Sequence, residues 1–204
     1  MASDLLNDLN KEQQAAVVQT EGPVLILAGA GSGKTRVLTY RVAYLIAEKK
    51  VSPHNILMVT FTNKAANEMK ERIAKLLIIH SDLPFAGTFH SLCVKILRIG
   101  GKHIGISPNF LIYDEQDSLD AIKDVMKKLD ISTKNFNPRA ILGTISQAKN
   151  ELIAAIEYPQ YARGYFQETA ARVYLAYQKL LKENEAVDFD DLLMSTVQLF
   201  ERNE

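Results

Sequence analysis

The sequence predicts an α/β fold, with a parallel β-sheet in the first half of the 204-residue chain and helices in the second half. Two observations predict it. Short apolar runs alternate with helical patterns in the first half, and a glycine-rich loop joins the first run to the first helix. Strands that are separated by helices pair in parallel and are covered by helices on both faces, which gives three layers.

The elements of the first half follow in order from these patterns. A buried strand is predicted at 24–28 and helices at 34–49, 64–79 and 90–99, the last of which stops at a Gly-Gly pair. Two further strands are predicted at 56–61, after the turn signal Ser-Pro-His-Asn, and at 85–89. Because ligands bind at the carboxyl ends of parallel strands, we expect the loops after the three strands to share one face.

The second half reads as all-helical. Apolar residues at helical spacing, joined by polar segments that contain Pro138 and Pro159, predict helices at 117–129, 138–150, 161–183 and 189–202. Their apolar stripes are interpreted as packing surfaces.

Composition excludes several classes of protein. A hydrophobic content of 47% is sufficient for a substantial core, and the single cysteine, Cys93, excludes a disulfide within the chain. The sequence has a polar N-terminus and no run of eighteen apolar residues, so a cytoplasmic protein without a membrane partner is expected.

The two halves of the chain differ in charge. Residues 1–105 carry 13 Lys and Arg against 8 Asp and Glu, and residues 106–204 carry 11 against 16. The charges of +5 and −5 favour an anionic ligand for the first half, although solvated helix faces would also produce them.

The glycine-rich loop at 28–35 has the pattern of a triphosphate site. Gly29, Gly31 and Gly33 allow backbone N–H groups to approach phosphates closely. Lys34 is placed to reach the outer phosphates, and the Thr35 hydroxyl to bind Mg²⁺. The usual pattern begins with glycine where this chain has Ala28. The alternative is a chance strand-to-helix turn with a surface lysine.

Two further strand ends carry side chains that suit single-stranded nucleic acid. The first, at 60–66, includes Phe61, Thr62, Asn63 and Lys64, and the second is 87–91, Gly-Thr-Phe-His-Ser. Hydroxyls, amides and helix starts hold phosphates, and aromatic rings stack on bases. The alternative for the first is that Thr62 or Asn63 caps a helix and Phe61 is buried.

An apolar run at 110–113 ends in Asp114 and Glu115. The pattern by itself allows two interpretations. The two acids could bind Mg²⁺ and activate water, as in a nucleotide hydrolase, or they could form the acidic start of a helix.

Five motifs in order resemble the UvrD/PcrA/Rep family of superfamily-one DNA helicases, and most of all its PcrA branch. They are Leu-Asn-Lys-Glu-Gln at 9–13, Ala-Gly-Ala-Gly-Ser-Gly-Lys-Thr-Arg at 28–36, Thr-Phe-Thr-Asn-Lys-Ala-Ala at 60–66, Thr-Phe-His at 88–90 and Asp-Phe-Asp-Asp-Leu at 188–192. The segments 141–146 and 148–152 also match, and the family tolerates alanine at position 28.

The resemblance implies ATP and Mg²⁺ as cofactors, with Lys34 and Thr35 as catalytic residues and Thr35 as the Mg²⁺ ligand. In the family Gln13, with Asn10 nearby, reads adenine and Arg36 stacks on it. The implied nucleotide contacts are Asn10, Gln13, Ala28, Gly29, Ala30, Gly31, Ser32, Gly33, Lys34, Thr35 and Arg36. The implied DNA contacts are Phe61, Thr62, Asn63, Thr88, Phe89, His90 and Phe189, with Phe189 in a base pocket; Lys64 is added from the residue pattern.

The resemblance also implies a RecA-like P-loop parallel sheet with an inserted all-helical subdomain. The expected division is 1–113 for the first RecA-like domain, 114–187 for the helical accessory subdomain and 188–204 for a helix leading back. The family's Asp-Glu motif lies beyond 188–192, so Asp114 and Glu115 are expected to be structural. The chain is expected to be the N-terminal part of a longer protein. Because the rest of that protein would supply further strands, an edge of the sheet is expected to be unpaired in this chain.

The implied function is that of an ATP-dependent 3′-to-5′ helicase, which translocates on single-stranded DNA and unwinds duplexes in repair or replication. Its partners would be single-stranded DNA, junctions of single- and double-stranded DNA, and repair or replication proteins of unknown identity. We expect the chain alone to bind nucleotide weakly without appreciable hydrolysis. The rival functions are a non-enzymatic module that binds single-stranded DNA or a partner, and a small phosphate-loop enzyme such as a kinase.

Overall fold

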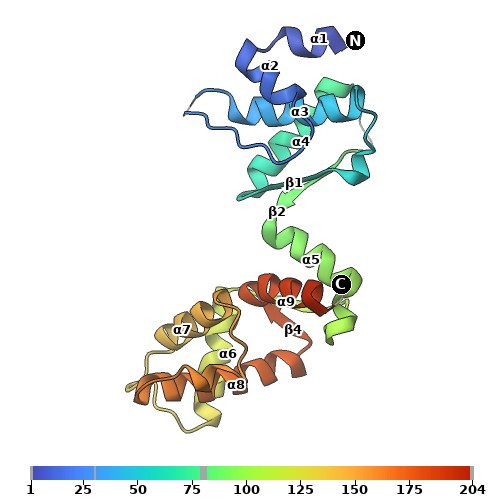
Figure 1. Cartoon of the computed structure of the whole chain (residues 1–204). Coiled ribbons are helices and arrows are strands. Elements are labelled where there is room, and N and C mark those ends of the chain that lie inside the picture. Colours follow the sequence, from blue (N-terminus) through green and yellow to red (C-terminus); the bar gives the residue numbers. More distant parts are fainter. Residues whose placement is uncertain (1, 30, 79–81, 203–204) are drawn as a thin grey trace. The chain divides into compact units, whose positions relative to one another are not determined.

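The computed structural model describes residues 2–29, 31–78 and 82–202. It divides into two compact units, residues 1–89 and residues 90–204 (Figure 1). The predicted boundaries at 113/114 and 187/188 concern the family's domains and stay predictions. Among the described residues, no helix combines the length and apolar character that a membrane span requires.

The first unit combines helices with two strands. In chain order its elements are α1 (Ala2–Asn7), α2 (Lys11–Val18), α3 (Lys34–Ala47), a 3-10 turn (Pro53–Asn55), β1 (Leu57–Thr60), α4 (Asn63–Leu77) and β2 (Phe85–Thr88). The predicted strands at 56–61 and 85–89 and the helices at 34–49 and 64–79 are therefore present, except that residue 79 lies outside the described residues.

Strands β1 and β2 pair in parallel, with Thr60 opposite Thr88 at their carboxyl ends. Apolar residues of α3, α4 and both strands form a core on one face, including Val42, Met58 and Ile73. Leu57 and Val59 point away from this core and are exposed. The described residues therefore make two layers here, and not the three that were predicted.

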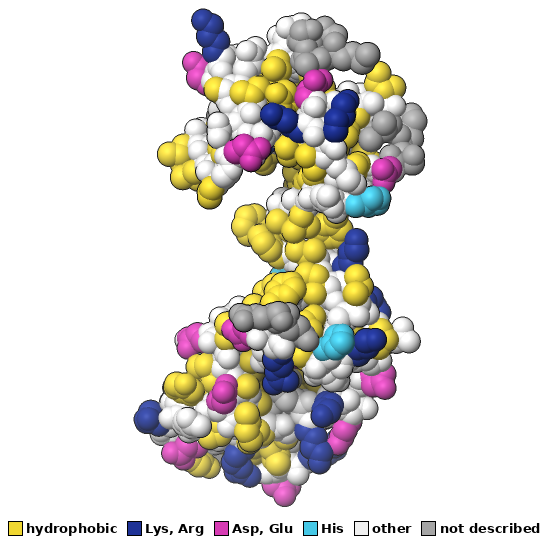
Figure 2. Space-filling model, turned by 45° about the vertical axis from the view of Figure 1, so that its right-hand side comes forward, with side chains coloured by type: hydrophobic (Ala, Val, Ile, Leu, Met, Phe, Trp, Pro, Cys, Tyr) yellow, Lys and Arg dark blue, Asp and Glu magenta, His cyan; other side chains and the backbone are white. Residues whose placement is uncertain are grey.

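The predicted buried strand at 24–28 is not formed, which corrects the sequence reading. This segment has no regular secondary structure, and Leu25 and Leu27 are 83% and 86% exposed. A strand is stabilised by hydrogen bonds and side-chain packing with its neighbours. No described strand pairs with this segment, so its apolar composition alone does not make it a strand. Figure 2 shows apolar side chains on the surface of the molecule.

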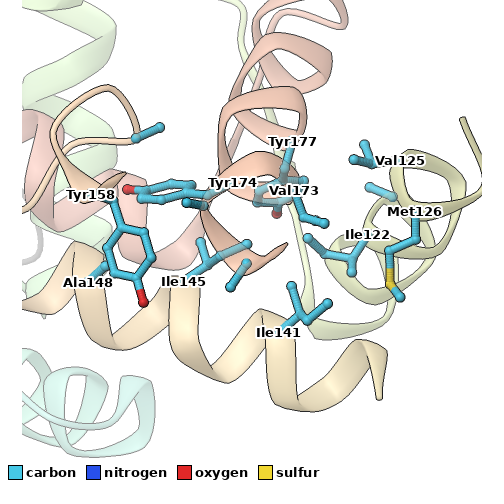
Figure 3. Close-up of a cluster of buried hydrophobic side chains, with 14 of the residues drawn as sticks. Ile122, Val125, Met126, Ile141, Ile145, Ala148, Tyr158, Val173, Tyr174 and Tyr177 are labelled. Carbon is cyan, nitrogen blue, oxygen red and sulfur yellow. The ribbon is translucent and has the colours of Figure 1, made fainter. Parts of the chain in front are cut away.

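The second unit is mostly helical. Helix α5 (Phe89–Gly100) starts at the end of the first unit and leads into it. Its remaining elements are a 3-10 turn (Gly101–Ile104), β3 (Leu111–Tyr113), α6 (Glu115–Lys128), α7 (Pro138–Asn150), a 3-10 turn (Tyr158–Gln160), α8 (Tyr165–Glu183), β4 (Ala186–Asp188) and α9 (Phe189–Arg202). Side chains from α6, α7 and α8 converge in one core, which includes Ile122, Ile141, Tyr174 and Tyr177 (Figure 3).

Two predictions for this half are wrong. It is not all-helical, because β3 pairs in parallel with β4, with Leu111 opposite Ala186. Residues 111–113 and 186–188 are strands because each segment supplies the other's hydrogen-bond partners. Helical periodicity does not reveal such a long-range pairing. Helix α8 also begins at Tyr165 and not at residue 161, because Gly164 takes a left-handed φ of 80° immediately before it.

Candidate functional site

The glycine-rich loop ends at the N-terminus of α3, in a conformation that depends on its glycines. Gly31 and Gly33 have φ values of 78° and 86°, in the left-handed region that disfavours residues with a Cβ. A Cβ built on Gly29 or Gly31 would meet nothing within 4 Å, so the space beside these positions is open. Open backbone at the start of a 14-residue helix suits an anionic group.

The predicted catalytic side chains lie at this helix start. The Lys34 ammonium donates to the carbonyl oxygens of Ala28 and Gly29, at 3.1 and 2.8 Å, so it is held across the loop. Thr35 is exposed in the first turn of α3. Ser32 closes the loop by donating to the carbonyl of Gly29 at 2.7 Å. Ala30, another predicted nucleotide contact, lies outside the described residues.

The predicted base-reading residues are linked to the same loop. Asn10 and Gln13 form a capping box at the start of α2, and Gln13 Nε2 also donates to the Ser32 carbonyl at 3.1 Å. Arg36 donates to the carbonyl of Asp8 at 2.7 Å, and its guanidinium carbon lies 5.4 Å from the centre of the Tyr40 ring. The Arg36 guanidinium therefore lies over a ring of the chain itself.

A hollow of about 620 Å³ lies between α2, the segment before the loop and the start of α3. Asn10, Gln13, Ser32 and Lys34 line it together with the segment 24–29. Ligand pockets usually measure about 300–1,000 Å³, so the hollow has the size for a nucleotide. The hollow therefore brings Asn10 and Gln13 together with Ser32 and Lys34, whereas Thr35 and Arg36 are not among the residues that line it.

The candidate DNA contacts of the first unit gather at the carboxyl ends of β1 and β2. Phe61 follows β1, Phe89 follows β2, and their ring centroids are 6.0 Å apart. Phe61 is 89% exposed, which excludes the alternative that it is buried. Exposed neighbouring rings at one sheet edge are suited to stacking on bases. The expectation that the loops after these two strands share one face is confirmed.

Helix α4 begins beside Phe61 with polar, exposed residues. Thr62 is the N-cap, and its hydroxyl accepts from the N–H of Ala65 at 3.1 Å. Asn63 and Lys64 lie in the first turn, exposed. The alternative that Thr62 caps the helix is therefore correct. A phosphate at this helix start would meet the other N–H groups of the first turn and the side chain of Lys64. Thr88 lies opposite the end of β1, as the last residue of β2.

A second aromatic pair lies in the second unit. The rings of His90 and Phe189 are nearly perpendicular, with centroids 5.7 Å apart and an interplanar angle of 86°. Phe189 is exposed at the start of α9 and lines a cavity of about 300 Å³ with Asp114, Arg139 and Ser146. An aromatic residue at a cavity of this size is consistent with the predicted base pocket.

The two acids after β3 have structural roles. Asp114 is the N-cap of α6 and accepts from the N–H of Asp117 at 2.8 Å, while the Asp117 carboxylate accepts from the N–H of Asp114. Glu115 pairs with Arg139 at 3.1 Å on the surface. The geometry therefore favours the helix-start interpretation over an acid that serves catalysis.

Sequence reasoning missed a buried charged cluster. Lys149 lies 2.6 Å from Asp188 and 2.8 Å from Asp191, and Tyr177 donates to Asp188 at 3.0 Å. Burial raises the pKa of Asp191 to about 6, while the charge of Lys149 lowers it. The spacing of residues in α7 could have indicated this cluster. Lys149 lies four residues after Ile145, which itself lies four after Ile141, so it falls on the buried face of the helix.

Comparisons with known proteins agree with these features. The family model described as UvrD/REP helicase N-terminal domain matches residues 9–204. Over 202 residues, 99% of its length, the chain is 53% identical to the ATP-dependent DNA helicase PcrA of Bacillus subtilis (strain 168). It is 54% identical over 97% of its length to the protein of that name from Staphylococcus aureus (strain Mu50). The chain spans 27% of the length of each of these relatives.

Proposed function

Because the chain belongs to the UvrD/REP helicase family, we propose that it forms the first nucleotide-binding and DNA-contacting part of an ATP-dependent DNA helicase. The observation that carries the proposal is the loop at 28–35. Left-handed glycines, a lysine held across the loop and an exposed threonine meet there at a helix start. When bound, Mg²⁺ would neutralise phosphate charge, with Thr35 holding it.

The finer assignments are part of the same proposal. Gln13 and Arg36 would recognise adenine, and a RecA-like arrangement would place the nucleotide beside the carboxyl ends of the strands. Phe61 and Phe89 would stack on bases of single-stranded DNA in the first unit, and Phe189 would contact a base in the second unit. Translocation in the 3′-to-5′ direction and unwinding at junctions are proposed from the resemblance to the family alone. A role in repair or replication is proposed from the resemblance to the family.

We infer that this chain alone binds nucleotide without appreciable turnover. The electrostatic part of phosphoryl transfer is supplied here by Lys34 and the N-terminus of α3. The described acids that follow an apolar run, Asp114 and Glu115, are engaged in a helix cap and a surface ion pair. We therefore propose that neither positions the attacking water.

Titration of the chain with a fluorescent ATP analogue and Mg²⁺ tests the proposal. Lys34→Ala removes a charge-assisted contact with phosphate and should weaken binding about tenfold or more. Lys49→Ala, an exposed lysine beyond the opposite end of α3, is the matched control and should bind as the wild type does. Equal affinities for all three proteins would overturn the proposal.

A DNA-binding measurement separates the proposal from the rival non-enzymatic module. In a helicase the nucleotide and DNA sites are coupled, so ATP should change the affinity of the chain for single-stranded DNA. The rival predicts DNA binding that neither ATP nor Lys34→Ala alters.

A further inference from the structure

The side-chain amide of Gln13 connects two segments through different atoms. Its Nε2 donates to the carbonyl of Ser32 at 3.1 Å, and its Oε1 accepts from the backbone N–H of Asn10 at 3.2 Å. The first bond joins α2 to the phosphate loop across nineteen positions of sequence. The second fixes the amide itself, because the capping box holds it at the start of α2.

The amide lies against the last glycine of the loop. A Cβ built on Gly33 would lie 3.1 Å from Gln13 Nε2, which is tighter than ordinary packing. Gly33 is also the N-cap of α3, with a φ of 86°. Gln13 therefore contacts the loop where the backbone turns into the helix that would receive the phosphates.

Peptide geometry gives this contact a consequence for phosphate binding. The peptide group between Ser32 and Gly33 is planar and trans, so its C=O and N–H point in opposite directions. Holding the Ser32 carbonyl toward Gln13 thus directs the N–H of Gly33 away from α2. A donor fixed in advance loses less conformational entropy when it binds an anion than one that must first be oriented.

We propose that Gln13 is a positioning residue for the phosphate loop, which orients the Ser32–Gly33 peptide for the triphosphate whether or not a base is present. This inference rests on the proposed function and deepens it. It is compatible with reading adenine, because an amide has two N–H groups and an oxygen with two lone pairs. One donor and one lone pair remain for a base edge after the contacts to Ser32 and Asn10.

Inorganic tripolyphosphate with Mg²⁺ is the probe for the positioning role, because it carries the charges of a triphosphate and no base. Gln13→Met removes the donor to Ser32 and the acceptor for Asn10 without adding charge, and should weaken binding of tripolyphosphate by about 3- to 10-fold. Binding of ATP should weaken by at least the same factor, because any contact with the base is lost as well. Gln147→Met, a surface glutamine of α7 whose Nε2 donates to Glu151, is the matched control and should change neither affinity. Weaker binding of ATP with unchanged binding of tripolyphosphate would mean that Gln13 only reads the base, and would overturn the inference.

Amide hydrogen exchange of the chain without ligand gives a second, independent measurement. Gln13→Glu keeps an oxygen to accept from Asn10, so the capping box and α2 are retained, but it loses the donor to Ser32. We expect faster exchange at residues 31–35 and unchanged exchange within α2. Unchanged exchange in the loop would overturn the inference even if the chain binds nucleotide. Failure of the proposed function would appear differently, as wild-type chain that binds neither ATP nor tripolyphosphate.

Discussion

The ammonium of Lys149 on α7 lies 2.6 Å from the Asp188 carboxylate at the end of β4, with both side chains buried. The same ammonium lies 2.8 Å from Asp191 in the first turn of α9. Asp188 and Asp191 also cap each other's backbone N–H groups. Phe189 stands between these two acids in sequence, so the cluster fixes the backbone from which its ring contacts His90.

Replacing Lys149 should destabilise the second unit strongly. Lys149→Met leaves two buried carboxylates without their cation, and breaking a buried ion pair in this way costs about 3–5 kcal/mol. Lys179→Met is the matched control, because Lys179 is exposed on α8 and lies 3.8 Å from Glu183. That change should cost less than about 0.5 kcal/mol. Urea unfolding followed by circular dichroism measures both, and similar midpoints would contradict a stabilising role for Lys149.

The stability of the chain should carry a pH-dependent contribution from Asp191. Burial raises its pKa from 3.8 to about 6, against the opposing charge of Lys149, so the folded chain binds this proton more tightly than the unfolded chain does. Its contribution to stability is complete below the unfolded pKa. It is lost as the pH rises through about 6, because the carboxylate must then ionise in the interior.

Comparing wild type with Asp191→Asn isolates this contribution. The free energy of unfolding is measured for both between about pH 4 and pH 7.5. The stability of wild type relative to the variant should fall with rising pH and level off near neutrality. A difference that rises with pH would show that the pKa is lowered, as for an ordinary ion-paired carboxylate.

Local patterns in the sequence predicted most helices, whereas features that depend on distant partners were missed. Helix α7 was predicted at its observed bounds because Asn137, Pro138 and the apolar stripe are all local signals. The pairing of β3 with β4 joins residues far apart in sequence, and no local pattern encodes it. The segment 24–28 shows the converse, because a strand-like composition did not produce a strand without a partner.

The exposed ring of Phe61 should contribute directly to binding of single-stranded DNA. Phe61→Ala removes a stacking surface worth about 1–3 kcal/mol, so affinity for oligodeoxythymidine should fall about 5- to 150-fold. Phe200→Ala, an exposed phenylalanine on α9 outside the candidate sites, is the control. Fluorescence anisotropy at one fixed salt concentration measures both, because the phosphate contribution varies with salt. An equal loss of affinity in the two variants would contradict a direct role for Phe61, because any exposed aromatic residue would then contribute as much.

The sequence named candidate residues for the site, and their contacts became visible only in the structure. The spacing of residues 28–36 identified the loop, and the order of the strands brought Phe61 close to Phe89. The contact between Gln13 and Ser32 depends on how α2 packs beside the loop, which follows from tertiary structure. Residue types alone also left two interpretations of Asp114, and only its hydrogen bond to Asp117 favours the helix cap.

Two substitutions at Asp114 distinguish a helix cap from a catalytic acid. Asparagine caps helices about as well as aspartate, whereas alanine at an N-cap costs about 0.5–2 kcal/mol. Asp114→Asn should therefore keep the wild-type stability, and Asp114→Ala should lower it by about 1 kcal/mol in urea unfolding. An acid that binds Mg²⁺ or activates water needs its charge, so either change would abolish any ATP turnover by the chain. Turnover that is measurable in wild type and absent from Asp114→Asn would establish a catalytic role, because the cap survives in that variant.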